Sequence, residues 1–284
     1  MSTAPGPLLT RGVHDALLAA RGAGVAMVEC SLDLGRSVTA VAVGASEWSW
    51  NGQRFPFMAT CRDRTIYHWA SRGFQPVARF TTSLIKLVPT EWGPPTFEID
   101  GIKMLPTARV SPYADAERKV GLIEPRGKAI LDTCGGLGYF AAWCLRGGAA
   151  RVDSCEKSAD VLWLRSLNPW SPDSPWGHDS ADALNLRQAD VAEHIATIED
   201  QSVDAILHDP PRFGIAGDLY SQVFYDNLAR VLRRNGTLFH YTGAPNRIAS
   251  GRDLASEVTH RLRRAGFAAE PVGDGVLAVK GRRA

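Results

Sequence analysis

The stretch KAILDTCGGLGYFAAWCLRGGAARVDSCEK, residues 128–157, decides the fold of this chain. A short apolar run ends in an acid and a glycine-rich turn, a helix-like segment follows, and a second apolar run ends in Glu156. A strand, a glycine loop, a helix and a second strand in that order form a β-α-β unit, in which the two strands run parallel. The stretch therefore predicts a parallel sheet.

The same alternation continues to the end of the chain. Strand-like runs lie at residues 203–209 and 237–243, helix-like runs lie at 161–167, 221–236 and 254–266, and a final pair of strands surrounds Asp274-Gly275. A pair joined by Asp-Gly is typical of a β-hairpin. We expect residues 113–284 to form an α/β domain with a doubly wound, mostly parallel seven-stranded sheet and an antiparallel terminal hairpin.

Residues 1–112 have a different pattern of apolar and polar residues. Short apolar runs alternate with polar residues, and Asn51-Gly52 and Asp100-Gly101 stand at the centres of two of them. These dipeptides between β-forming residues predict hairpins. A short helix with Thr10 as its N-cap precedes this β region. We expect an N-terminal helix and antiparallel β-hairpins that cover the substrate.

Composition excludes several classes of protein. The chain has 284 residues, a net charge of +2 and five cysteines with no CxxC pair, so we expect no disulfide framework and no metal site. The basic run Arg261–Arg264 is typical of a solvated helix face, and no apolar run suggests a signal peptide or a membrane span. We expect a cytoplasmic protein with a small-molecule substrate and no nucleic-acid or membrane partner, and a homodimer stays open.

The glycine loop predicts a nucleotide site at the carboxyl ends of the strands. Gly136 and Gly138 allow the backbone to turn tightly and to approach a ligand, and the following helix start presents free N–H groups. Glu156 lies eighteen positions after Gly138, where an acid accepts hydrogen bonds from ribose hydroxyls. The spacing from Gly136 to Ala141 also fits a loosened G-x-G-x-x-A pattern, so the loop alone leaves a nicotinamide dinucleotide open.

Asp132–Gly138 resembles the first motif of the class I, Rossmann-like methyltransferases that use S-adenosylmethionine (SAM), in which an acid opens the loop. Cys134 stands where many members of that family have another glycine. The resemblance implies that Asp132 lies near the methionine end of SAM, that Glu156 holds the ribose and that Asp190 approaches the adenine amine. The implied cofactor-binding residues are Asp132, Cys134, Gly136, Gly138, Tyr139, Glu156, Lys157, Asp190, Val191 and Asp209.

The segment VDAILHDPPRF, residues 203–213, indicates the reaction. Asp209-Pro210-Pro211 places a carboxylate at the end of a strand, in backbone stiffened by two prolines. It is similar to the (Asn/Asp)-Pro-Pro-aromatic motif of methyltransferases that act on nitrogen, with Arg212 in place of the aromatic residue. Together with the acid that opens the loop and the terminal hairpin, this motif favours SAM over a dinucleotide.

Residues 208–236 also look like a stretch of the spermidine synthases, in which a second Asp three residues after the first helps to bind the polyamine. Arg212 takes that position here. A guanidinium attracts carboxylate or phosphate instead of a polycation, so ordinary polyamine synthesis is disfavoured. From about Leu87 to Gly243, the chain resembles a spermidine-synthase-like branch of predicted methyltransferases.

These motifs predict a SAM-dependent transferase, with methyl transfer to a small amine-containing acceptor as the first interpretation. Asp209, Arg212 and Tyr241 are the expected catalytic residues: Asp209 orients or deprotonates the amine, and the Tyr241 ring stabilises a sulfonium by cation–π attraction. One alternative is alkyl transfer that releases methylthioadenosine, by aminopropyl or amino-carboxypropyl transfer or by cyclisation of SAM to an azetidine amino acid. A second alternative is a SAM-binding protein without catalysis.

Overall fold

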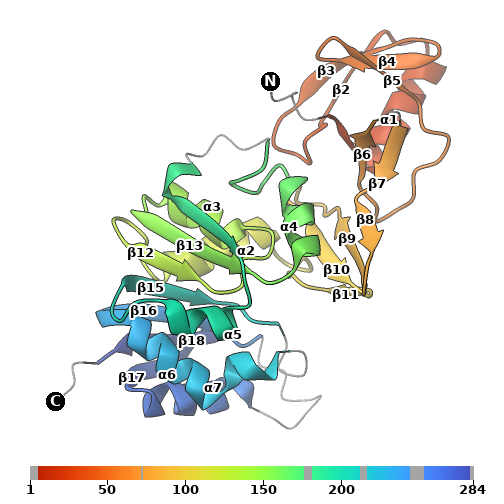
Figure 1. Cartoon of the computed structure of the whole chain (residues 1–284). Helices are drawn as coiled ribbons and strands as arrows, with labels where there is room; N and C mark the ends of the chain where they lie inside the picture. The colour runs from red at the N-terminus through yellow and green to blue at the C-terminus, as the bar shows by residue number, and fades with distance from the viewer. Residues whose placement is uncertain (1–5, 72, 176–180, 212–215, 244–252, 282–284) are drawn as a thin grey trace. The chain divides into compact units, whose positions relative to one another are not determined.

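The structure is a computed structural model that describes residues 6–71, 73–175, 181–211, 216–243 and 253–281 (Figure 1). The chain divides into two compact units. One consists of Met1–Asp115 and Trp163–Gly177, and the other of Ala116–Leu162 and His178–Ala284. Within the described ranges, no helix combines the length and the apolar character that crossing a membrane requires.

The second unit contains a seven-stranded sheet in the order β14-β13-β12-β15-β16-β18-β17 (Figure 1). The first five strands in this order pair in parallel, β18 pairs antiparallel with β16, and β17 pairs antiparallel with β18. The mostly parallel sheet with a terminal antiparallel hairpin is therefore confirmed. The strands are β12 (Ala129–Asp132), β13 (Arg151–Glu156), β14 (Leu184–Gln188), β15 (Val203–His208), β16 (Leu232–Tyr241), β17 (Phe267–Val272) and β18 (Gly275–Lys280).

Helices connect these strands as the alternating pattern predicts. The helix expected over residues 221–236 is shorter than predicted, because it ends at Val231 and Leu232 turns into the extended conformation to pair with Val203. The helices from residue 112 onward are α2 (Pro112–Gly121), α3 (Tyr139–Arg146), α4 (Ala159–Ser166), α5 (Val191–His194), α6 (Gln222–Val231) and α7 (Leu254–Arg264), and the short 3-10 turns are Ala181–Ala183, Ile195–Thr197 and Gly217–Tyr220.

The core of this unit is formed by the sheet and the helices packed against it. Leu131, Ile206 and Leu238, on the three central strands, are fully buried and belong to one cluster with Leu228 of α6 and Leu262 of α7. Consecutive residues of β12 and β15 are buried, as is typical of parallel strands. The ends of the strands are held in fixed positions by this packing.

The first unit contains helix α1 (Arg11–Gly22) and three small antiparallel sheets. Asn51 (φ 49°) with Gly52, and Asp100 (φ 49°) with Gly101, form the two predicted hairpin turns in the left-handed conformation. Thr10 is the N-cap of α1, but its side chain makes no capping hydrogen bond. The strands are β1 (Leu8–Leu9), β2 (Met27–Cys30), β3 (Thr39–Val43), β4 (Glu47–Trp50), β5 (Gln53–Pro56), β6 (Tyr67–Ala70), β7 (Gly73–Pro76), β8 (Ala78–Phe80), β9 (Leu84–Val88), β10 (Thr96–Ile99) and β11 (Ile102–Lys103).

Two buried histidines lie side by side at the ends of β15 and β16. His208 Nδ1 is 2.7 Å from Thr133 Oγ1, His240 Nε2 is 3.0 Å from the Tyr225 hydroxyl oxygen, and the two rings meet edge to face at 4.4 Å. Burial lowers the pKa of His208 well below its usual range and lowers the pKa of His240 to about 4. Both rings are therefore neutral at neutral pH, and the contact between them joins the two strands.

The neutral histidines predict a loss of stability in mild acid. The ordinary histidine pKa is 6.5, so below that pH the unfolded chain binds protons that folded His240 does not. The free energy of unfolding should then fall by up to about 1.4 kcal/mol per pH unit for each such group. Urea unfolding at pH 7 and at pH 5 should show a larger loss for the wild type than for His240→Gln, and an equal loss would contradict a neutral buried His240.

A close approach of backbone at the start of β18 predicts a second stability effect. A Cβ added to Gly275 would lie 2.5 Å from the His240 carbonyl oxygen and 2.6 Å from Phe239 Cζ. Gly275→Ala should destabilise the protein by about 1–3 kcal/mol through overpacking. Gly121→Ala is the matched control, because an added Cβ there meets nothing within 4 Å. Thermal unfolding of both variants measures the difference, and an unchanged midpoint for Gly275→Ala would show that the strands separate easily.

Candidate functional site

The parallel strands of the second unit end at one edge of the sheet. β12 pairs in parallel with β13 on one side and with β15 on the other, so the strand order reverses at β12. Ligands of such sheets bind outside the carboxyl ends of the strands at this switch point. The residues at or directly after these ends are Asp132, Glu156, Gln188, Asp209 and Tyr241. All of the predicted site residues in the described ranges lie on this unit.

The glycine loop after β12 is tied to the end of β13. Gly136 (φ +49°) and Gly138 (φ +80°) adopt the left-handed conformation, which favours glycine. The Gly136 amide donates to Glu156 Oε2 at 2.9 Å, and the Ser158 amide donates to Glu156 Oε1 at 2.8 Å. Glu156 is thus held in place by backbone amides at the end of β13.

The next strand end carries an ion pair. Lys157 Nζ donates to Asp190 Oδ2 at 2.6 Å, and the Ala192 amide donates to Asp190 Oδ1 at 3.0 Å, so that Asp190 caps helix α5. The hydrogen bond from Lys157 holds the pKa of Asp190 below its usual value. Val191, the first residue of α5, is buried. These groups form a polar rim beside Glu156.

Three other residues predicted to bind the cofactor are buried or half-buried. Asp132 is fully buried, and its Oδ2 accepts from the Ser154 hydroxyl at 2.8 Å. Tyr139 is buried at the start of α3. Cys134 is half-buried, and burial, reinforced by the charge of Glu156, raises the pKa of its thiol well above the usual range. The Cys134 thiol is therefore neutral at neutral pH, which disfavours a role as a nucleophile.

At the end of β15 a lysine joins two of the predicted catalytic residues. Lys119 Nζ, on helix α2, is 3.6 Å from Asp209 Oδ2 and 3.7 Å from the centre of the Tyr241 ring. The Lys119 side chain is 2% exposed and that of Asp209 is 22% exposed. Tyr220 donates to the Pro211 carbonyl at 3.1 Å, and burial together with the charge of Asp209 raises the pKa of Tyr220. The Asp209 carboxylate thus lies beside a buried ammonium, and its charge acts on the Tyr220 hydroxyl.

The sequence interpretation missed Lys119, although its pattern contains a signal. Ala116 and Val120 of α2 and Ile123, just after the helix, are buried, and Lys119 lies three positions after the first and four before the last. A lysine on the apolar side of a helix is unusual unless its charge is paired. Arg212, the third predicted catalytic residue, lies outside the described residues.

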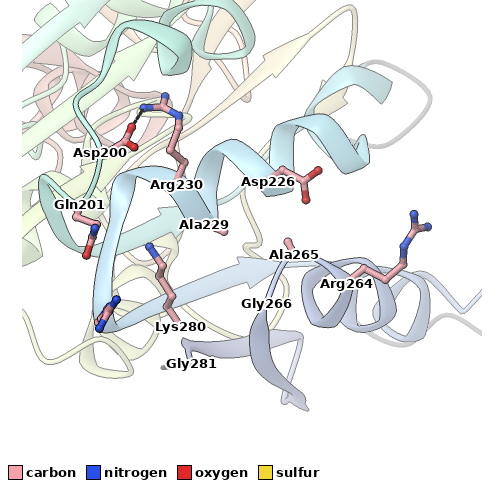
Figure 2. A pocket seen from close by; sticks show the side chains of 11 residues that line it. Asp200, Gln201, Asp226, Ala229, Arg230, Arg264, Ala265, Gly266, Lys280 and Gly281 are labelled. Atoms are coloured by element: carbon pink, nitrogen blue, oxygen red, sulfur yellow. Dashed lines mark hydrogen bonds and ion pairs between the residues drawn. The ribbon is translucent and has the colours of Figure 1, made fainter. Parts of the chain in front are cut away.

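A separate cavity of about 500 Å³ lies at the opposite edge of the sheet (Figure 2). Arg230 of α6 lines it, but its guanidinium is committed to Asp200 at 2.6 Å and to the carbonyl oxygens of Ile195 and Ile198 at 2.7 Å. None of the predicted site residues within the described ranges lines this cavity. The hydrogen bonds of Arg230 are made to the chain itself, and, among the described residues, this cavity contains none of the predicted motifs. The carboxyl edge of the sheet therefore remains the candidate site.

Two solved structures share the fold. A spermidine synthase in complex with the transition state analogue AdoDATO matches with a TM-score of 0.55 and 18% identity, over 72% of this chain and 73% of that chain. A spermidine synthase from Thermotoga maritima matches with a TM-score of 0.52 and 16% identity, over 72% of this chain and 71% of that chain. These likenesses support the Rossmann-like architecture.

Comparison of sequences identifies a relative. No protein-family model matches the chain. The uncharacterized protein MJ1233 of Methanocaldococcus jannaschii is 42% identical over 201 residues, which cover 69% of this chain and 67% of that protein. Identity of this extent means common descent with the same fold. The chain therefore belongs to the family of MJ1233.

Proposed function

We propose that this chain is a SAM-dependent transferase that methylates a small amine-containing acceptor. One observation carries the proposal. The glycine loop after β12 is bonded to Glu156 at the end of β13. The Asp209 carboxylate follows β15, which pairs with β12 on its other side, so both features lie where the strand order reverses. A nucleotide-type cofactor and an acceptor would then meet at one edge of the sheet.

The groups at this edge suit a SAM-type cofactor. Glu156 would hold the ribose hydroxyls, Asp190 and Val191 would border the adenine, and the glycine loop would approach the methionine part. The fixed Glu156 carboxylate and the Asp190 cap supply acceptors for hydroxyl and amine donors. When bound, SAM supplies a carbon activated by the adjacent positively charged sulfur.

The residues of the chain would then perform three tasks. The Asp209 carboxylate orients the acceptor amine and takes up the proton that the nitrogen loses. The Tyr241 ring holds the Lys119 ammonium beside this carboxylate, and Tyr220 fixes the Pro211 carbonyl that follows it. Positioning of the two reactants contributes most of the acceleration in a displacement of this kind, so acid–base demands are modest.

The charges at Asp209 favour a small acceptor over a polyamine. The Lys119 ammonium already accompanies Asp209 at 3.6 Å. Because Lys119 balances the charge of Asp209, a second cation on the acceptor gains little net attraction from this pair. An acceptor with a single reactive amine does not depend on that attraction. Transfer of an aminopropyl group to a polyamine is therefore disfavoured, in agreement with the position of Arg212 in the sequence.

Calorimetry should detect the cofactor directly. The wild type should bind SAM and not a nicotinamide dinucleotide. Glu156→Gln should weaken SAM binding by about tenfold or more, because one charged hydrogen-bond partner is lost. Asp226→Asn, in the cavity at the opposite edge, is the control and should bind as the wild type does. Binding of the dinucleotide without SAM would contradict the proposal.

Product analysis should identify the group that is transferred. The enzyme is incubated with SAM and a pool of small amines, and the nucleoside product is measured by mass spectrometry. We expect S-adenosylhomocysteine. Accumulation of methylthioadenosine, with or without an amine, would instead assign alkyl transfer or cyclisation of SAM.

The same assay tests Asp209. Asp209→Asn should bind SAM but turn over about a hundredfold or more slowly, because the amide neither carries a negative charge nor accepts a proton well. Calorimetry with SAM on the same preparation is the control for an intact site. An unchanged rate would remove Asp209 from the mechanism.

A further inference from the structure

We propose that Lys119 sets the charge selectivity of the transfer site, so that the site takes SAM and rejects decarboxylated SAM. The inference rests on the proposed function and adds a specificity-determining residue to it. Three observations support it: the burial of Lys119, its contact with Asp209 and its contact with the Tyr241 ring.

The Lys119 ammonium is built into the site. Its side chain is 2% exposed, on a helix side that it shares with buried Ala116 and Val120. Burying an ammonium is unfavourable unless the charge is matched, and here a carboxylate lies on one side and an aromatic face on the other. The Phe140 ring lies farther away, at 5.9 Å. The lysine therefore stays close to Asp209 instead of extending into solvent.

The pairing changes what the carboxylate can attract. Decarboxylated SAM lacks the α-carboxylate of SAM and so carries one more positive charge. A carboxylate near the methionine end of the cofactor would favour decarboxylated SAM if no cation balanced the charge of that carboxylate. With Lys119 beside it, the charge of Asp209 is balanced, so the pair gives the additional cation no net attraction. Since the site is partly desolvated, the effect is weakly screened by salt.

Two substitutions change the net charge of the Lys119–Asp209 pair in opposite directions. Lys119→Met keeps a side chain of similar length and lowers the charge of the pair by one unit. Asp209→Asn keeps the shape and raises the charge by one unit. The double variant returns to the charge of the wild type. A side chain that matters only for packing would not give this pattern of opposite shifts.

The experiment measures calorimetric affinities for SAM and decarboxylated SAM in the wild type, both single variants and the double variant. The preference for SAM should fall at least tenfold in Lys119→Met and rise at least threefold in Asp209→Asn. The double variant should return close to the wild type. Lys128→Met is the control, because the Lys128 ammonium donates to the Ile123 carbonyl before β12, at the opposite edge of the sheet. In this variant the ratio of the affinities for SAM and decarboxylated SAM should not change.

Three results would overturn the inference: an unchanged ratio in both single variants, a shift in the same direction in both, or a wild type that prefers decarboxylated SAM. If Lys119→Met does not fold, as judged by circular dichroism, the shift in Asp209→Asn alone decides. A wild type that binds neither compound would instead contradict the proposed function, so the two failures are distinguishable.

Discussion

The parallel pairing of β12 with both β13 and β15 is the constraint on which the candidate site depends. Because both neighbours run in the same direction as β12, the glycine loop, Glu156 and Asp209 emerge at one edge. The buried core holds these strands in register, and the neutral His208 and His240 join the last two parallel strands just before the site. Chemistry at the edge is thus positioned by packing inside the sheet.

Electrostatics then divides this edge into two regions. Toward β14, Glu156 is held by backbone amides and Asp190 is paired with exposed Lys157, an arrangement suited to polar contacts with a nucleoside. Toward β16, Asp209 is paired with buried Lys119. Exposed ion pairs exchange easily with solvent and ligands, whereas a buried pair fixes the local charge. Under the proposed function, the second region is the one that would discriminate the charge of a substrate.

Much of this arrangement follows from local sequence patterns. The Asn51-Gly52 and Asp100-Gly101 turns, the glycine loop and the mostly parallel sheet were predictable because each depends on residues close together in the chain. Lys119 was not, since its partners Asp209, just after β15, and Tyr241, at the end of β16, come about ninety and one hundred and twenty positions later. The end of α6 at Val231 was missed because pairing of Leu232 with Val203 outweighs a continuing helical pattern.

Hydrogen exchange measured by mass spectrometry, with and without SAM, tests most directly whether the carboxyl edge is the binding edge. If it is, amides of the loop around Gly136 and of the segment around Asp190 should become protected when SAM binds, and those around Gln201 and Gly266, at the opposite cavity, should not change. Protection confined to the opposite cavity would contradict the account.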